Sequence, residues 1–182
     1  KYSKYDIDNI KVGTTIGTNA LLERNGSKVL LLVTKGLCDN FIIGTQQREN
    51  IFARHFIRKD NIFTSTLAVN ERVTYKGKIL IKLNEDKMLK DLKEFFKKGY
   101  RSIAIVLLNS FAYPVHEKKI EKIAKKIGFI NISCSHKVSP TINFTSRGFT
   151  TLVDAYLNPL IQNYIQFIEK NCSAKNIFYM QS

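Results

Sequence analysis

Two short apolar runs constrain the fold of this chain more than any other feature. Residues 28–34 form the first run, which is closed by Gly36, and residues 102–108 form the second. Runs of this length without polar alternation are typical of strands buried on both faces of a parallel sheet. Parallel strands need crossover connections, which are usually helices. The sequence therefore predicts an α/β fold.

Amphipathic helices are predicted around the second run. Asn84 is expected to cap a helix with acidic residues in its first turn, and apolar residues then recur on one face up to Gly99. Pro114 sets the first turn of another helix, which Gly128 ends. The other expected elements are a short helical turn at 37–42, a hairpin of 67–74 with 79–83, a strand at 130–134, a helix at 149–168 interrupted or kinked at Pro159, and a strand at 176–180.

This order of elements predicts a single α/β domain over residues 1–182. Its core would be a mostly parallel sheet flanked by helices and joined by right-handed crossovers, with one inserted hairpin. The first ten residues show no strong strand, and the last predicted strand runs to Ser182 without a cap or turn. We therefore expect the chain to be cut from a larger protein.

The net charge of +14 raises the question of a polyanionic partner. Most lysines, however, lie on the two predicted helices, interleaved with glutamates and with apolar residues at helical spacing. That pattern is typical of a solvated helix face, so we do not expect nucleic-acid binding.

The cysteines and histidines indicate neither a disulfide framework nor a metal site. Cys38, Cys134 and Cys172 are odd in number, widely spaced and not arranged as C-x-x-C, which favours a reducing, cytoplasmic setting. His55 and His136 lack ligand spacing, so no metal site is assigned to side chains. The apolar runs are too short to cross a bilayer.

The region from Gly13 to Gly26 is the richest candidate for chemistry. Glycines and threonines precede a helical turn, and they can present hydroxyls and backbone N–H groups to an anion at a helix start. A capped helix before a core strand uses the same residue types, so the residues alone leave both interpretations open.

Several blocks in this chain resemble the N-terminal region of the 5-oxoprolinase and hydantoinase A family. The region 13–26 is similar to the family signature H-G-T-T-x-x-T-N-A-L-L-E-R-x-G. Further similar blocks follow in the family's order at 33–39, 43–52, 69–73, 110–117, 146–159 and 180–182. The blocks at 44–46 and 146–157 look more like 5-oxoprolinase than like the bacterial hydantoinase subunit.

The resemblance implies part of an actin-like or sugar-kinase-like ATPase lobe. It also implies a reaction in which ATP, with Mg²⁺, activates the amide of 5-oxo-L-proline so that water opens the ring to L-glutamate. ATP is needed because an unstrained lactam resists water, and the protein supplies positioning and charge stabilisation. The other implied partners are the remaining domains of a full-length protein and further copies in a homo-oligomer. The alternatives are a hydantoinase subunit and a non-catalytic remnant that serves as an interaction module.

The chain also departs from the family pattern. The family's Asp-x-Gly-Gly-Thr phosphate turn is expected before Lys1 and its Asn-Gly-Gly turn after Ser182, so the isolated chain is expected to be inactive. Val12 stands where the family has histidine, so any role of that imidazole is lost or transferred.

Candidate site residues follow from the matching blocks. The catalytic candidates are Asp39, Glu71 and Asp154. The candidates for substrate or nucleotide binding are Gly13, Thr14, Thr15, Asn19, Gln46, Arg48, Arg72 and Arg147.

Each catalytic candidate also has a structural interpretation. Asp39 equally suits a helix cap. Glu71 and Arg72 could form an exposed hairpin ion pair worth roughly 0–1 kcal/mol. Asp154 lies two helical turns after Arg147, so the two could form a buried pair. For the His116-Glu117 step at the start of the second helix, the structural role is favoured, because Glu117 suits the positive end of a helix.

Overall fold

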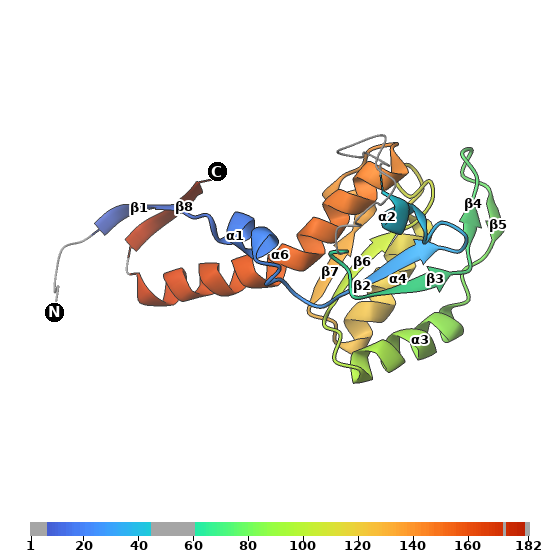
Figure 1. Ribbon diagram of the computed structural model, residues 1–182, viewed down its shortest axis with the longest axis horizontal. Coiled ribbons are helices and arrows are strands. Elements are labelled where there is room, and N and C mark those ends of the chain that lie inside the picture. The colour runs from blue at the N-terminus through green and yellow to red at the C-terminus, as the bar shows by residue number, and fades with distance from the viewer. Residues whose placement is uncertain (1–6, 45–60, 173, 181–182) are drawn as a thin grey trace, which may run out of the picture. The chain divides into compact units, whose positions relative to one another are not determined.

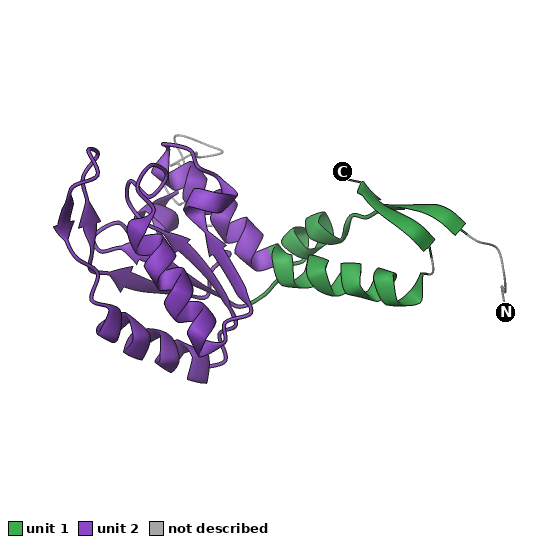
Figure 2. Ribbon diagram, turned by 180° about the vertical axis from the view of Figure 1, so that it is seen from behind, with its two compact units in different colours: residues 1–27, 157–182 green, residues 28–156 purple. Residues whose placement is uncertain are grey.

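The computed structural model describes residues 7–44, 61–172 and 174–180 and divides the chain into two compact units (Figure 2). The larger unit comprises residues 28–156, and the smaller one combines residues 1–27 with 157–182. The expectation that residues 1–182 form one domain stays a prediction.

A four-stranded parallel sheet forms the centre of the larger unit (Figure 1). Its order is β3 (Ser65–Val69), β2 (Val29–Thr34), β6 (Ser102–Val106) and β7 (Asn131–Cys134). Every residue of β2 and β6 is buried, so the two apolar runs form central strands, as predicted. The predicted strand at 130–134 is confirmed as β7.

Two helices, α3 (Glu85–Lys97) and α4 (Val115–Ile127), pack on each other and on one face of this sheet. Asn84 caps α3 as predicted, because its side-chain oxygen accepts a 2.9 Å hydrogen bond from the Lys87 N–H. Gly128 ends α4 in the left-handed conformation, with φ of +106°. Both predicted helices are confirmed.

Replacing Asn84 with alanine is expected to lower the free energy of unfolding by about 1 kcal/mol, because the α3 cap is lost. Urea unfolding of the protein measures this, and Asn84→Asp, which keeps an acceptor, serves as the control. Equal losses in both variants would contradict the capping role.

The opposite face of the sheet packs against α2 (Asn40–Ile43) and the first part of α6 (Phe144–Asn171). Phe41 of α2 lies 5.5 Å from Phe144 and 5.7 Å from Phe149, measured between ring centroids. Gly148 brings α6 close to Phe41. The predicted helix at 149–168 is confirmed as part of α6, which runs through Pro159 without the predicted interruption. The alternative, a kink at Pro159, stays a prediction.

The hairpin differs in part from its prediction. Strands β4 (Arg72–Val73) and β5 (Ile79–Ile81) pair as an antiparallel hairpin. Residues 65–69, however, belong to the parallel sheet as β3, so the predicted first arm at 67–74 combined two strands. The chain turns at Glu71, whose N–H donates to the Val69 carbonyl at 3.0 Å.

The smaller unit contains β1 (Ile7–Gly13), α1 (Ile16–Leu22), the last part of α6 and β8 (Ala174–Met180). Strands β1 and β8 pair in parallel, which confirms the last predicted strand. The expectation that the first ten residues lack a strand is wrong. Strand β1 carries polar residues among its apolar ones and is mostly exposed, so no buried-strand pattern marks it.

Candidate functional site

Polar side chains gather where the four parallel strands of the larger unit end. In sheets of this type, ligands bind outside the carboxyl ends of the strands. Here those ends carry Thr34 as the last residue of β2, Glu71 after β3, the segment 107–110 after β6, and 135–136 after β7. This edge is the candidate functional site.

The first cluster at this edge surrounds Glu71, which is only 1% exposed. Its carboxylate accepts a 2.5 Å hydrogen bond from the Thr34 hydroxyl and lies 2.7 Å from Nδ1 of His116. The Leu108 N–H donates to the same Thr34 oxygen at 2.9 Å. The structure therefore shows Glu71 joining the ends of three strands to α4.

The interpretation of Glu71 and Arg72 as an exposed ion pair is wrong, because Glu71 is buried and paired with His116. Arg72 instead donates from Nη2 to the Lys35 carbonyl at 3.3 Å. The chain turns at Glu71, so these adjacent residues face different surroundings.

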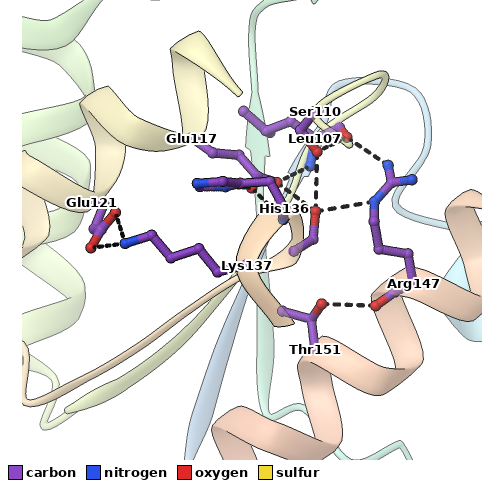
Figure 3. Close-up of polar contacts among 9 residues, drawn as sticks. Leu107, Ser110, Glu117, Glu121, His136, Lys137, Arg147 and Thr151 are labelled. Carbon is purple, nitrogen blue, oxygen red and sulfur yellow. Dashed lines mark hydrogen bonds and ion pairs between the residues drawn. The ribbon is translucent and has the colours of Figure 1, made fainter. Parts of the chain in front are cut away.

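The second cluster surrounds Glu117, whose side chain is fully buried (Figure 3). One carboxylate oxygen accepts from the Leu107 N–H at 3.0 Å and from the Ser135 hydroxyl at 2.7 Å. The other accepts from the His136 N–H at 3.1 Å and lies 2.6 Å from Nδ1 of His136. These contacts favour the structural role for Glu117, although they reach the ends of β6 and β7 and not the start of its own helix.

Arg147 completes the second cluster from α6 and is fully buried. It donates to the Ser135 hydroxyl at 3.1 Å and to the carbonyls of Thr141 and Leu107 at 2.6 and 3.0 Å. Burial lowers the pKa of the Arg147 guanidinium, while the nearby Glu117 charge acts in the opposite direction. Arg147 therefore holds the segments after β6 and β7 in place.

Asp154 lies away from this edge. It accepts a 2.6 Å hydrogen bond from Ser133, within β7, and the next residue, Ala155, accepts from Ser102 at the start of β6. Among the ion pairs of the described residues there is none between Arg147 and Asp154. The structure thus does not bring Asp154 together with Glu71.

Glu121 gives this region a measurable pH dependence. Burial acts to raise the pKa of Glu121, but hydrogen bonds from Lys125 and Lys137 outweigh it and bring the pKa to about 2 from an ordinary 4.5. A depressed carboxyl pKa stabilises the fold above the ordinary value, and this stabilisation is lost as the pH falls from about 4.5 to about 2.

We expect Glu121→Gln to reduce the difference in unfolding free energy between pH 6 and pH 3. Urea unfolding at both values measures the change. The control is Glu94→Gln, which removes an exposed carboxylate on α3. An unchanged pH dependence in Glu121→Gln would contradict the assignment.

The other sequence candidates lie in different places. Asp39 is exposed, directly before α2, and its side chain makes no cap hydrogen bond. Gln46, Arg48 and His55 lie outside the described residues. Gly13, Thr14, Thr15 and Asn19 belong to the smaller unit, at the end of β1 and in and before α1.

In the smaller unit, the threonine hydroxyls are partly used by local contacts. Thr14 accepts from the Ile16 N–H at 3.2 Å, and Thr15 accepts from the Asn19 side chain at 3.5 Å. Thr15 is the residue before α1 and makes no side-chain cap bond. Val12, at the position of the family histidine, pairs with Tyr179 between β1 and β8.

The sequence did not single out Thr34, Ser135 and His136 as members of these polar clusters. Their partners are far away in the chain, and hydroxyl residues at strand ends are common, so spacing gave no signal. His136 is notable because its Nε2 is buried and has no hydrogen-bond partner among the described residues.

The remaining expectations concern cysteines, metals and membranes. All three cysteines are free, and burial raises the pKa of the Cys134 thiol well above its usual range. Residues 7–44, 61–172 and 174–180 contain no group of three or more His, Cys, Asp or Glu side chains that could hold a metal ion. Within the same ranges, no helix has the length and apolar character to cross a membrane.

The fold is that of an α/β protein with parallel sheets flanked by helices. The solved ATP-dependent caprolactamase from Pseudomonas jessenii is similar to it, with a TM-score of 0.83 and 25% identity over 93% of this chain and 26% of that chain. An acetone carboxylase matches with a TM-score of 0.74 at 23% identity, which bears on the fold alone. The predicted fold class, part of an actin-like lobe, is confirmed.

The sequence matches the hydantoinase/oxoprolinase N-terminal region over residues 1–128, and the chain belongs to this family. The 5-oxoprolinase of Dictyostelium discoideum is 39% identical over 98% of the chain, and 5-oxoprolinase 1 of Arabidopsis thaliana is 37% identical over 95%. The chain spans only 16% of the length of each of these relatives.

Proposed function

We propose that this chain contributes to ATP-dependent hydrolysis of a cyclic amide, with 5-oxo-L-proline as the substrate and L-glutamate as the product. The observation that carries the proposal is the 39% identity to a 5-oxoprolinase across nearly the whole chain. The structural likeness to an ATP-dependent caprolactamase supports the same class of reaction. Because the chain spans a small part of these relatives, we propose that it works within a longer protein. We also propose that this protein is cytoplasmic and forms homo-oligomers.

The chemistry needs an activated amide. The γ-phosphoryl group of ATP is transferred to the amide oxygen, and ADP is released. One water then adds to the amide carbon and the ring C–N bond breaks, which gives an amine and an acyl phosphate. A second water hydrolyses the acyl phosphate to the carboxylate and phosphate. An unactivated amide is a poor electrophile, so the protein must position both reactants and stabilise the transferring charge. Mg²⁺ usually binds one or two carboxylates together with nucleotide phosphates.

The proposed roles of the site residues follow from their exposure. Asp39 is the accessible acidic candidate and Arg72 is half-buried, so both can reach a ligand. Glu71 and Arg147 are buried, so we assign them to positioning of the strand ends. Asp154 has Ser133 as its partner, and its catalytic role is the least supported of the three carboxylates.

In the smaller unit, Gly13, Thr14, Thr15 and Asn19 are proposed to bind substrate or nucleotide. They are supported by the family signature that they match. Gln46 and Arg48 keep the same proposed role on the same ground.

The test uses the longer protein that contains this chain. ADP and glutamate are measured with 5-oxo-L-proline, with hydantoin and without a cyclic amide. We expect ADP and glutamate to form together only with 5-oxo-L-proline, and Asp39→Asn to reduce this activity. Activity with hydantoin alone would support a hydantoinase subunit, and a folded protein inactive with both would support a non-catalytic remnant.

A further inference from the structure

We propose that Lys35 and Arg72 together form a binding site for one anionic oxygen group. The group is either the carboxylate of the cyclic amide or a phosphate of the nucleotide. The identity of these ligands rests on the proposed function, whereas the site itself rests on the geometry of the sheet edge.

The two cationic residues follow adjacent parallel strands that end in register. Thr34 of β2 is paired with Val69 of β3, and the Lys35 N–H donates to the Val69 carbonyl at 2.8 Å. One nitrogen of the Arg72 guanidinium lies 3.3 Å from the Lys35 carbonyl oxygen. This contact fixes Arg72 beside the Lys35 backbone while leaving its other N–H groups available, since a guanidinium has five.

The nearby carboxylates do not neutralise these cations. Glu71, next to Arg72 in sequence, is turned inward onto Thr34 and His116. Asp39 is exposed on the segment after β2. Among the described residues, no ion pair involves Lys35, Arg72 or Asp39. The edge therefore carries two cationic side chains without an ion-pair partner among the described residues, together with the exposed Asp39 carboxylate.

Gly36 leaves room next to these charges. Its φ is +89°, and a Cβ added there would meet no atom of the described residues within 4 Å, apart from its two chain neighbours. Its N–H has no acceptor among the described residues. A backbone N–H in such a turn adds a donor for an anion, and open space allows the anion to approach the backbone.

The charges distinguish between classes of cyclic amide. At neutral pH, 5-oxo-L-proline carries one carboxylate, whereas 2-pyrrolidinone has the same five-membered ring without it. A guanidinium fork with an ammonium group matches a carboxylate or a phosphate, and charged hydrogen bonds are stronger than neutral ones. If the site binds the carboxylate, it selects anionic cyclic amides over neutral ones.

The experiment compares Lys35→Met, Arg72→Gln and the conservative Arg72→Lys in the longer protein. Lys78→Met is the matched control, because Lys78 is an exposed lysine of the same unit beyond this edge. The KM values for 5-oxo-L-proline, 2-pyrrolidinone and ATP are measured separately. Calorimetric binding of 5-oxo-L-proline and of ATP adds a measurement that needs no turnover.

We expect Lys35→Met and Arg72→Gln to raise KM and Kd for one anion by roughly 10- to 100-fold. Arg72→Lys, which keeps the positive charge, should raise both constants less than Arg72→Gln does. A higher KM for 5-oxo-L-proline, without a higher KM for 2-pyrrolidinone or ATP, identifies a carboxylate site. A higher KM for ATP alone identifies a phosphate site. Circular dichroism shows whether Arg72→Gln is folded. If it is not, Lys35→Met still tests the site, because Lys35 is exposed and its replacement should leave the fold intact.

The proposal is overturned if both variants bind both anions as the Lys78→Met control does, or if the unmodified protein binds neither anion. Failure of the proposed function gives a different result, in which anions bind at Lys35 and Arg72 but no cyclic amide is hydrolysed.

Discussion

Replacing Glu117 with alanine is expected to lower the free energy of unfolding by about 3–5 kcal/mol, the range for removing one partner of a buried charged network. The carboxylate accepts hydrogen bonds from the Leu107 and His136 backbones and from Ser135. The two backbone N–H groups would lose their acceptor, and each lost partner costs about 1–3 kcal/mol, whereas Ser135 keeps its contacts with Ser110 and Arg147. Equilibrium urea unfolding measures the total.

Two further variants distinguish the stability lost with the buried hydrogen bonds from the stability lost with a negative charge alone. Glu117→Gln keeps the shape but turns one acceptor into a donor, so we expect a smaller but clear loss. Glu85→Ala removes an exposed carboxylate that pairs with Lys119, and such pairs contribute roughly 0–1 kcal/mol. A loss in Glu117→Ala no larger than that in Glu85→Ala would contradict the role of the buried cluster.

The larger unit was predictable because its elements have strong local patterns. Strands β2 and β6 are apolar throughout, and α3 and α4 have a cap or an end residue at the expected positions. Strand β1 was missed because it lies mostly exposed and lacks such a pattern. The hairpin was partly misplaced because only pairing partners distinguish β3 from β4, and pairing is not a local property.

The polar clusters could not be derived from spacing. Glu71 meets Thr34 and His116 across 37 and 45 positions of the chain, and Glu117 meets His136 across 19. Parallel strands bring such distant residues to one edge, whereas the sequence shows them only as single polar residues after apolar runs. The family resemblance found Glu71 and Arg147 as site candidates but did not show that both are buried.

Burial changes the roles that these residues can have. The carboxylate of Glu71 is buried and held by a hydroxyl and an imidazole, which fits the proposed positioning role better than direct contact with a substrate. Arg72 and Asp39 remain accessible at the same edge. In the proposed site, Glu71 therefore has a positioning role, and its neighbour Arg72 has the role of contacting a ligand.

Replacing Gly148 with alanine is expected to destabilise the protein by about 1–3 kcal/mol, although alanine favours helices by about 1 kcal/mol over glycine. A Cβ at this position would clash with the Phe41 ring and would lie only 3.2 Å from Val106. Phe41 is 1% exposed and packed between Phe144 and Phe149, so its ring has little room to move. The close approach of α6 to α2 therefore requires glycine.

Urea unfolding of two controls decides between packing and helix propensity. Gly17→Ala in α1 would place its Cβ no closer than 3.7 Å to Leu157, so it should be neutral or stabilising. Adding Phe41→Leu to Gly148→Ala should recover part of the loss, because a smaller side chain makes room for the new methyl group. If Gly148→Ala behaved like Gly17→Ala, α6 would not pack on Phe41 as described. Because Arg147 precedes Gly148, the same displacement of α6 should also weaken the hydrogen bonds of Arg147 to the ends of β6 and β7.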